Sequence, residues 1–182
     1  MNETTKVTQT KLPHLILWIS ALCMLICFLL PYASATKDRK EHLKEYSDYY
    51  FAEEIGMTNQ DAINISLLEY CKMYTYAAKV EVTQTLAIIC LVVMGITALL
   101  AVLTLLFAFL KKPIATFIFN LINLGAFSLM GWDYKDRGVI GNDNYAFGLG
   151  YYLYYVLIVV VFAMAVWLFA AKRQEKKEKS AE

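Results

Sequence analysis

Four uninterrupted apolar segments constrain this chain more than any other feature of its sequence. They cover residues 13–32, 85–110, 113–131 and 151–171, and none of them contains Asp, Glu, Lys or Arg. A helix of about 20 apolar residues spans the roughly 30 Å of hydrocarbon in a bilayer. Buried helices of a soluble bundle would need polar faces, which these segments lack. The sequence therefore predicts an all-α integral membrane protein with four transmembrane helices.

The first apolar segment also resembles a secretory signal sequence. Lys6 and Lys11 precede its apolar core, and the small residues of the run 33–35 (Ala-Ser-Ala) follow it. The apolar run is longer than the usual core of a signal peptide, and Trp18 and Phe28 leave no gap in it. We therefore expect an uncleaved signal anchor, with cleavage after this segment as the alternative.

Basic residues set the expected orientation in the membrane. Lys111 and Lys112 occupy the gap between the second and third segments, and five Lys or Arg residues lie in the tail 172–182. By the positive-inside rule, this gap and this tail face the cytoplasm. The N-terminal tail 1–12 is then cytoplasmic too, and residues 33–84 and 132–150 are extracytoplasmic. We expect an antiparallel four-helix bundle in the plasma or cell membrane, because so short a gap forces neighbouring helices to run in opposite directions.

The segment 33–84 is predicted to form a helical hairpin outside the membrane. Residues 37–54 contain neither Gly nor Pro, and Leu43, Tyr46 and Tyr50 recur at helical spacing. This pattern predicts a first arm with one apolar and aromatic side.

The second arm of the hairpin is predicted to begin at Thr58 and Asp61, whose types and spacing match a capping box. No Gly or Pro occurs between Met57 and Met94, so we expect the helix to continue into the second span. A hinge at 83–85 is the alternative. An apolar stripe at helical spacing supports this arm: Ile63, Leu67, Tyr70, Tyr74 and Ala77.

The sequence offers no pattern for catalysis or for metal binding. The apolar segments contain no carboxylate, which argues against a pump that carries its own titrating group. The two histidines, His14 and His42, cannot form a metal triad alone, and no CxxC pair occurs. We therefore expect no enzyme activity, no catalytic residue, no metal, no cofactor and no nucleic-acid partner.

A polar stripe marks the third apolar segment. Thr116, Asn120 and Asn123 are spaced i, i+4, i+7, so they share one face of a helix. Amide side chains in lipid seek partners on neighbouring helices, and Thr97 or Thr104 of the second span can supply them. We favour this role as a contact between helices. The alternative is that the stripe lines a small oligomeric channel or transporter.

Aromatic residues are dense in the first outer segment. Rings bury a large area at low entropic cost and are enriched in protein interfaces. We therefore expect a non-catalytic polytopic membrane protein that acts through protein–protein contacts, as an accessory or scaffold subunit. Besides the lipid bilayer, its partner is expected to be a membrane protein or a second copy of the chain. The candidate partner-binding surface comprises Tyr46, Tyr49, Tyr50, Phe51, Tyr70, Tyr74 and Tyr76.

The order of four spans, with a larger first outer loop and a smaller second one, resembles the claudin plan. The claudin signature in the first loop is a tryptophan followed by a pair of cysteines. Here that loop has no Trp, and Cys71 is its one cysteine. The resemblance is therefore confined to topology and assigns no family.

Overall fold

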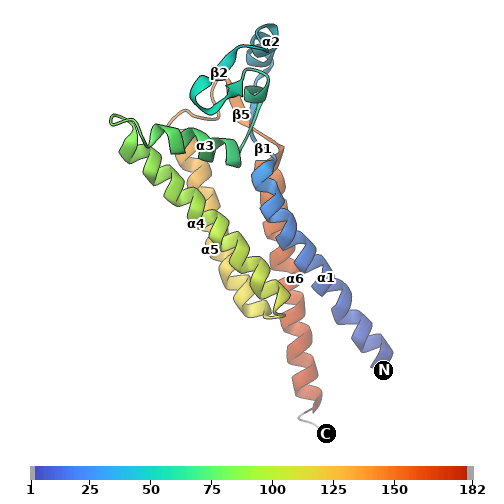
Figure 1. The fold of residues 1–182 in the computed structure, drawn as a ribbon. Coiled ribbons are helices and arrows are strands. Elements are labelled where there is room, and N and C mark those ends of the chain that lie inside the picture. Colours follow the sequence, from blue (N-terminus) through green and yellow to red (C-terminus); the bar gives the residue numbers. More distant parts are fainter. Residues whose placement is uncertain (1–2, 180–182) are drawn as a thin grey trace. The chain divides into compact units, whose positions relative to one another are not determined.

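The computed structural model describes residues 3–179 (Figure 1), and their side chains over residues 11–177. Four of its helices are long and apolar enough to cross a membrane. The predicted set of four long apolar helices is therefore confirmed. These helices are α1 (Glu3–Ile26), α4 (Gln84–Phe109), α5 (Pro113–Asp136) and α6 (Leu149–Lys179).

The ends of all four helices differ from the predicted bounds of the spans, those of α4 by one residue each. α1 begins inside the predicted tail 1–12, since neither Gly nor Pro interrupts the chain before Pro13. α5 extends five residues past 131, where Asp133 and Arg137 form an i, i+4 ion pair that supports the helix. α6 continues into the basic tail. Residues 1–2 and 180–182 of the predicted tails lie outside the described residues.

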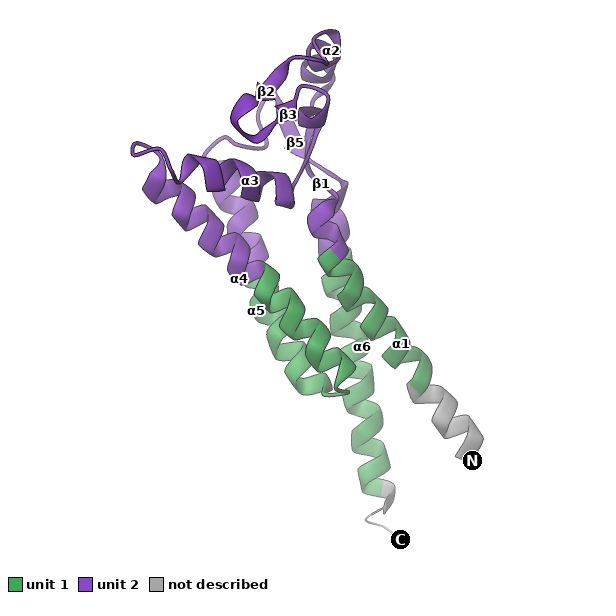
Figure 2. Cartoon of the chain, viewed as in Figure 1, with its two compact units in different colours: residues 1–25, 98–125, 155–182 green, residues 26–97, 126–154 purple. Residues whose placement is uncertain are grey.

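The chain forms two compact units (Figure 2). Unit 1 comprises the chain up to Leu25, residues 98–125 and the chain from Tyr155 onward. Unit 2 comprises residues 26–97 and 126–154. The helices α4, α5 and α6 each contribute residues to both units.

Unit 1 is held together by aromatic contacts between its helices. Phe107 of α4 stacks on Phe119 of α5, with ring centroids 4.9 Å apart. Phe117 of α5 meets Phe162 of α6 edge to face, also at 4.9 Å.

Between α4 and α5 the chain turns at Lys111, whose φ of 57° is left-handed. Such a residue ends a helix by letting the following amides bond to its last carbonyls.

Unit 2 contains a three-stranded sheet that the sequence did not predict. Its order is β4-β1-β5, with β4 over Asn64–Ser66, β1 over Pro31–Ala35 and β5 over Tyr145–Phe147. Both pairings are antiparallel, and Ala33 lies opposite Ile65 on one side and Phe147 on the other. The central strand β1 therefore joins the two segments that were predicted as separate outer loops.

The predicted helical hairpin over 33–84 is wrong. Two short helices, α2 (Lys37–Glu45) and α3 (Leu67–Ala77), lie within it, but strands and 3-10 turns separate them. The all-α class therefore describes the long helices and not this segment. The physical reason is that β1 and β4 pair through their backbones, which residue spacing along one helix cannot reveal. The remaining elements are β2 (Tyr50–Ala52), β3 (Met57–Thr58), η1 (Cys27–Leu29), η2 (Glu53–Ile55) and η3 (Asp61–Ile63).

The predicted continuous helix from Met57 into the second span is also wrong. α3 ends at Ala77 and α4 begins at Gln84, with turns over residues 78–83. Thr83 stabilises this break, because its hydroxyl donates to the carbonyl of Ala77 at 2.7 Å and its own carbonyl accepts from the amide of Ala87 at 3.0 Å. The break adjoins the position of the alternative hinge at 83–85.

α3 begins with a capping box formed by Ser66 and Glu69, which is not the predicted pair. The amide of Glu69 donates to Ser66 Oγ at 3.2 Å, and the amide of Ser66 donates to Glu69 Oε2 at 2.6 Å. The predicted pair does form reciprocal bonds: the amide of Thr58 donates to Asp61 Oδ2 at 3.0 Å, and the amide of Asp61 donates to Thr58 Oγ1 at 3.3 Å. That pair lies at the start of the short turn η3, whose first residue is Asp61, and does not cap an α-helix.

Candidate interaction surface

A group of aromatic side chains is exposed between the last turn of α2 and the first residue of β2. Tyr46, Tyr49 and Tyr50 are 43%, 69% and 60% exposed. The rings of Tyr46 and Tyr49 meet edge to face with centroids 6.0 Å apart, and the ring of His42 lies 5.2 Å from that of Tyr46. We call His42, Tyr46, Tyr49 and Tyr50 the tyrosine patch.

Hydrogen bonds to the backbone fix the loop that carries the tyrosine patch. Asn59 Nδ2 donates to the carbonyl of Tyr46 at 2.8 Å, and the amide of Asn59 donates to the carbonyl of Tyr49 at 2.9 Å. The amide of Tyr49 also donates to the carbonyl of Tyr46 at 3.1 Å. A loop that is already fixed loses less conformational entropy when it binds a partner. This arrangement suits a protein-binding surface.

The other four residues of the predicted surface are not part of the tyrosine patch. Phe51 and Tyr74 are half-buried, and Tyr76 is exposed on α3, apart from the patch in sequence. Tyr70 is only 4% exposed, so it belongs to the core and not to a surface. The helical stripe identified correctly that Tyr70 faces inward from α3. It could not distinguish burial within this chain from burial against a partner.

Tyr70 packs in a buried cluster of rings centred on Tyr32 of β1, which we call the Tyr32 cluster. Tyr32 is 1% exposed, and five rings meet it edge to face at centroid distances between 5.6 and 6.3 Å. Edge-to-face pairs are favourable because the positive edge of one ring meets the negative face of the other. Burial raises the pKa of Tyr70 above its ordinary value of 10.0, so its hydroxyl stays neutral. The five rings are those of Tyr70, Phe127, Tyr134, Phe147 and Tyr151.

Arg137 lies beside the Tyr32 cluster and is fully engaged in structural contacts. Its Nε donates to Asp133 Oδ1 at 3.0 Å, and its Nη2 donates to Cys90 Sγ at 3.2 Å. The guanidinium carbon lies 5.4 Å from the ring centroid of Tyr134, which is a cation–π distance. Burial disfavours the charge of Arg137, but the bond to Asp133 and the neighbouring Tyr74 raise its pKa above the ordinary value.

The predicted polar face of the third span is buried between helices of unit 1. Thr116, Asn120 and Asn123 each have 0% exposure. Asn120 Nδ2 donates to the carbonyl of Ile158 in α6 at 3.0 Å, and Thr116 Oγ1 donates to the carbonyl of Lys112 at 3.0 Å. A side-chain amide that bonds to a neighbouring helix is the contact expected of polar groups in lipid. Side chains buried this completely line an aqueous path only if the helices rearrange.

The expected partners from α4 do not take part in the bond of Asn120. Thr97 and Thr104 donate instead to carbonyls of their own helix, those of Val93 at 2.9 Å and Leu100 at 2.8 Å. Asn120 Oδ1 is buried with no hydrogen-bond partner in the described part of the chain. Residue spacing could not predict that the acceptor is a backbone carbonyl of α6, because every residue of that helix carries such a carbonyl.

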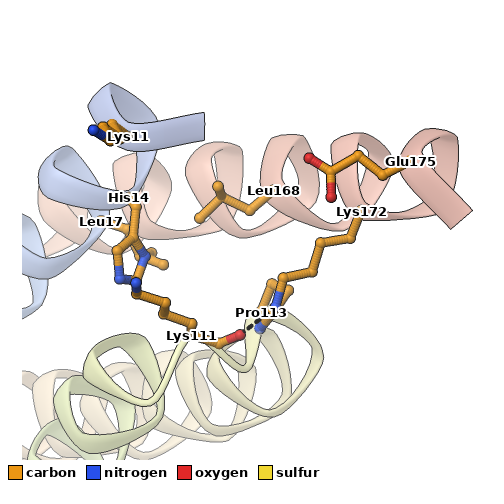
Figure 3. A pocket seen from close by; sticks show the side chains of 8 residues that line it. All are labelled: Lys11, His14, Leu17, Lys111, Pro113, Leu168, Lys172 and Glu175. Atoms are coloured by element: carbon orange, nitrogen blue, oxygen red, sulfur yellow. Dashed lines mark hydrogen bonds between the residues drawn. The ribbon is translucent and has the colours of Figure 1, made fainter. Parts of the chain in front are cut away.

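A small basic cavity lies in unit 1, where α1, the α4–α5 turn and α6 meet (Figure 3). Its volume is about 170 Å³, and Lys11, His14, Lys111 and Lys172 line it together with Glu175. Lys172 reaches from α6 to the carbonyl of Lys111, to which its ammonium donates (Figure 3). A cation at this position complements the negative C-terminal end of α4.

The described residues contain no group of three or more His, Cys, Asp or Glu side chains placed to hold a metal ion. The four cysteines, Cys23, Cys27, Cys71 and Cys90, form no disulfide there.

No protein-family model matches the chain, and no significant match is found among curated proteins or solved structures. The likeness to the claudin plan therefore stays a likeness of span and loop order. Function must be inferred from the residues and their geometry.

Proposed function

We propose that the protein is a non-catalytic multi-pass membrane protein that acts through protein–protein contacts, as an accessory or scaffold subunit. The observation that supports this proposal is the tyrosine patch, in which exposed rings stand on a loop fixed by Asn59. Tyrosine is enriched among the residues that dominate binding energy in interfaces. Three exposed tyrosines within five residues therefore form a candidate anchor for a partner.

The membrane arrangement that we propose is an antiparallel bundle of the four long helices in the plasma or cell membrane, with both termini in the cytoplasm. Lys111 and Lys112 at the α4–α5 turn, with the basic residues at the end of α6, support this orientation. The sheet of unit 2 and the tyrosine patch are then extracytoplasmic. The proposed partner is a membrane protein with an outer segment of its own.

The test is a triple variant, Tyr46→Ala/Tyr49→Ala/Tyr50→Ala, purified from native membranes in mild detergent and analysed by mass spectrometry. We expect the wild-type chain to recover a stoichiometric second protein. The triple variant should recover at least about tenfold less of this protein, because a single anchor ring typically contributes a factor of about ten or more to the binding affinity. Tyr76→Ala measures how far the surface extends along α3.

The matched control is Val82→Ala, which truncates an apolar side chain that is 94% exposed and outside the tyrosine patch. This variant should recover the partner as the wild type does. Recovery of an unchanged set of partners by the triple variant contradicts the proposal. Recovery of only a second copy of the chain assigns the patch to a homo-oligomer and removes the accessory role.

A further inference from the structure

A groove lined by basic side chains runs along the α4–α5 turn and the end of α6 in unit 1. Its volume is about 590 Å³, within the range typical of ligand sites. Among the described residues that line it there is no Asp or Glu. The basic lining residues are Lys111, Lys112, Lys172, Arg173 and Lys176.

An apolar slot continues this basic groove between α5 and α6. Its volume is about 300 Å³, and all its lining residues are apolar, among them Phe117 and Val166. Pro113, Ile114 and Phe169 line both the slot and the basic groove. The two hollows are therefore contiguous, and we call them together the α5–α6 groove.

The two halves of the α5–α6 groove match the two halves of a phospholipid. A cluster of Lys and Arg at the cytoplasmic ends of transmembrane helices attracts acidic headgroups. An apolar slot beside it accommodates an acyl chain, which packs against the apolar side chains of the slot through dispersion contacts. A soluble anion would use the basic half alone, and a protein partner would need access to a slot that lies within the apolar helices.

We propose that the α5–α6 groove binds an anionic phospholipid of the cytoplasmic leaflet. Lys112 and Arg173 hold its phosphate, and the acyl chain lies against Ile114, Phe117 and Phe169. The planar guanidinium of Arg173 offers the paired donors that suit a phosphate. Lys172 contributes charge, although its ammonium already donates to the carbonyl of Lys111. This proposal rests on the membrane orientation given above and not on the tyrosine patch.

The test uses the full-length protein reconstituted in nanodiscs of phosphatidylcholine and phosphatidylglycerol, then released into mild detergent. Native mass spectrometry counts the lipids that stay bound. We expect wild-type protein to retain phosphatidylglycerol in preference to phosphatidylcholine. Lys112→Gln/Arg173→Gln should retain roughly tenfold less phosphatidylglycerol, since each basic residue near the membrane surface contributes a several-fold factor. Both substitutions spare Lys111 and Lys172, which bond to each other.

A charge-matched control and a charge-neutral variant separate the two halves of the groove. Lys44→Gln/Lys79→Gln removes the same charge from exposed positions of unit 2, outside the groove, and should leave retention unchanged. Val166→Trp fills the apolar slot without changing charge and should lower phosphatidylglycerol retention. Partner recovery through the tyrosine patch should be the same in all these variants.

Three results would overturn the proposal. The first is equal retention of the two lipids by the wild type. The second is retention unchanged by both the double variant and Val166→Trp. The third is release of the lipid by excess inorganic phosphate, which would indicate an anion site that makes no use of the apolar slot. If the double variant does not fold, the lipid preference of the wild type and the effect of Val166→Trp still decide.

Discussion

Unit 2 uses tyrosine in two opposite ways. In the Tyr32 cluster, rings from β1, α3, α5, β5 and α6 cover one another, and Tyr32 is 1% exposed. In the tyrosine patch, the loop backbone is fixed by Asn59 while Tyr49 remains 69% exposed. The difference teaches that aromatic content does not by itself mark a binding surface. Rings that several elements converge on stabilise the fold, and rings on a loop held only through its backbone stay available to a partner.

The comparison between the two groups of tyrosines predicts its largest difference in stability between Tyr32→Ala and Tyr49→Ala. Tyr32→Ala should lower the free energy of unfolding by about 3–5 kcal/mol, because it opens a cavity among five packed rings. Tyr49→Ala should change it by less than about 0.5 kcal/mol, as exposed substitutions usually do. Denaturant unfolding of purified protein in detergent, followed by circular dichroism, measures both. Equal effects would show that the patch is part of the core and would break the comparison.

An intermediate effect is expected where β5 joins the Tyr32 cluster. The amide of Gly148 donates to the carbonyl of Tyr32 at 2.8 Å. A Cβ at Gly148 would clash with the carbonyl oxygen of Pro31, which belongs to the backbone and cannot rotate away. Gly148→Ala should therefore cost about 1–3 kcal/mol of stability by forcing β1 and β5 apart.

The control for Gly148→Ala is Gly95→Ala in α4, where an added Cβ meets no atom within 4 Å. Because Ala favours a helix over Gly, this variant should gain up to about 1 kcal/mol. Both free energies come from the same unfolding experiment. A loss of stability in Gly95→Ala as large as that in Gly148→Ala would show that the close approach to Pro31 is not the cause.

The long helices were predictable from sequence because the length of an apolar run is a local property. Burial of the stripe through Leu67 and Tyr70 was predictable for the same reason, since it depends on spacing within one helix. The sheet was not, because its central strand pairs with residues 145–147, far along the chain. Local signals for β5 were present: the run Tyr145–Phe147 lies between Asn144 and Gly148, which are residue types that flank strands.

The candidate surface was predictable only in part. The predicted surface contained Tyr70 together with Tyr46, Tyr49 and Tyr50. Tyr70 is buried, whereas the other three are exposed. Helical spacing placed Tyr46 and Tyr50 on a helix, but α2 ends at Glu45, so both lie beyond it. The lysines at the α4–α5 turn were visible in the sequence, whereas the apolar slot beside them depends on the packing of α5 on α6.

The smallest expected effect is a pH dependence of stability, which we expect from the exposed part of unit 2 and not from its core. Bonds from the backbone and hydroxyl of Thr58 lower the pKa of Asp61 below its ordinary 3.8. The stability that this carboxylate contributes is therefore present at neutral pH and is lost as pH falls from about 4 through the lowered pKa. Asp61 is exposed, so solvent screening limits this contribution to less than about 1 kcal/mol.

The measurement compares wild type with Asp61→Asn, which cannot ionise at that position. The difference in melting temperature between the two should be largest near neutral pH and should shrink at acidic pH, below 3.8, as the wild-type carboxylate takes up its proton. The Tyr32 cluster should add nothing to this change, because burial keeps the pKa of Tyr70 above 10.0 and the ring neutral throughout. Tyr32→Phe should therefore shift the melting temperature equally at both pH values. A difference between wild type and Asp61→Asn that stays constant on acidification would mean that the bonds to Thr58 do not depend on the charge of Asp61.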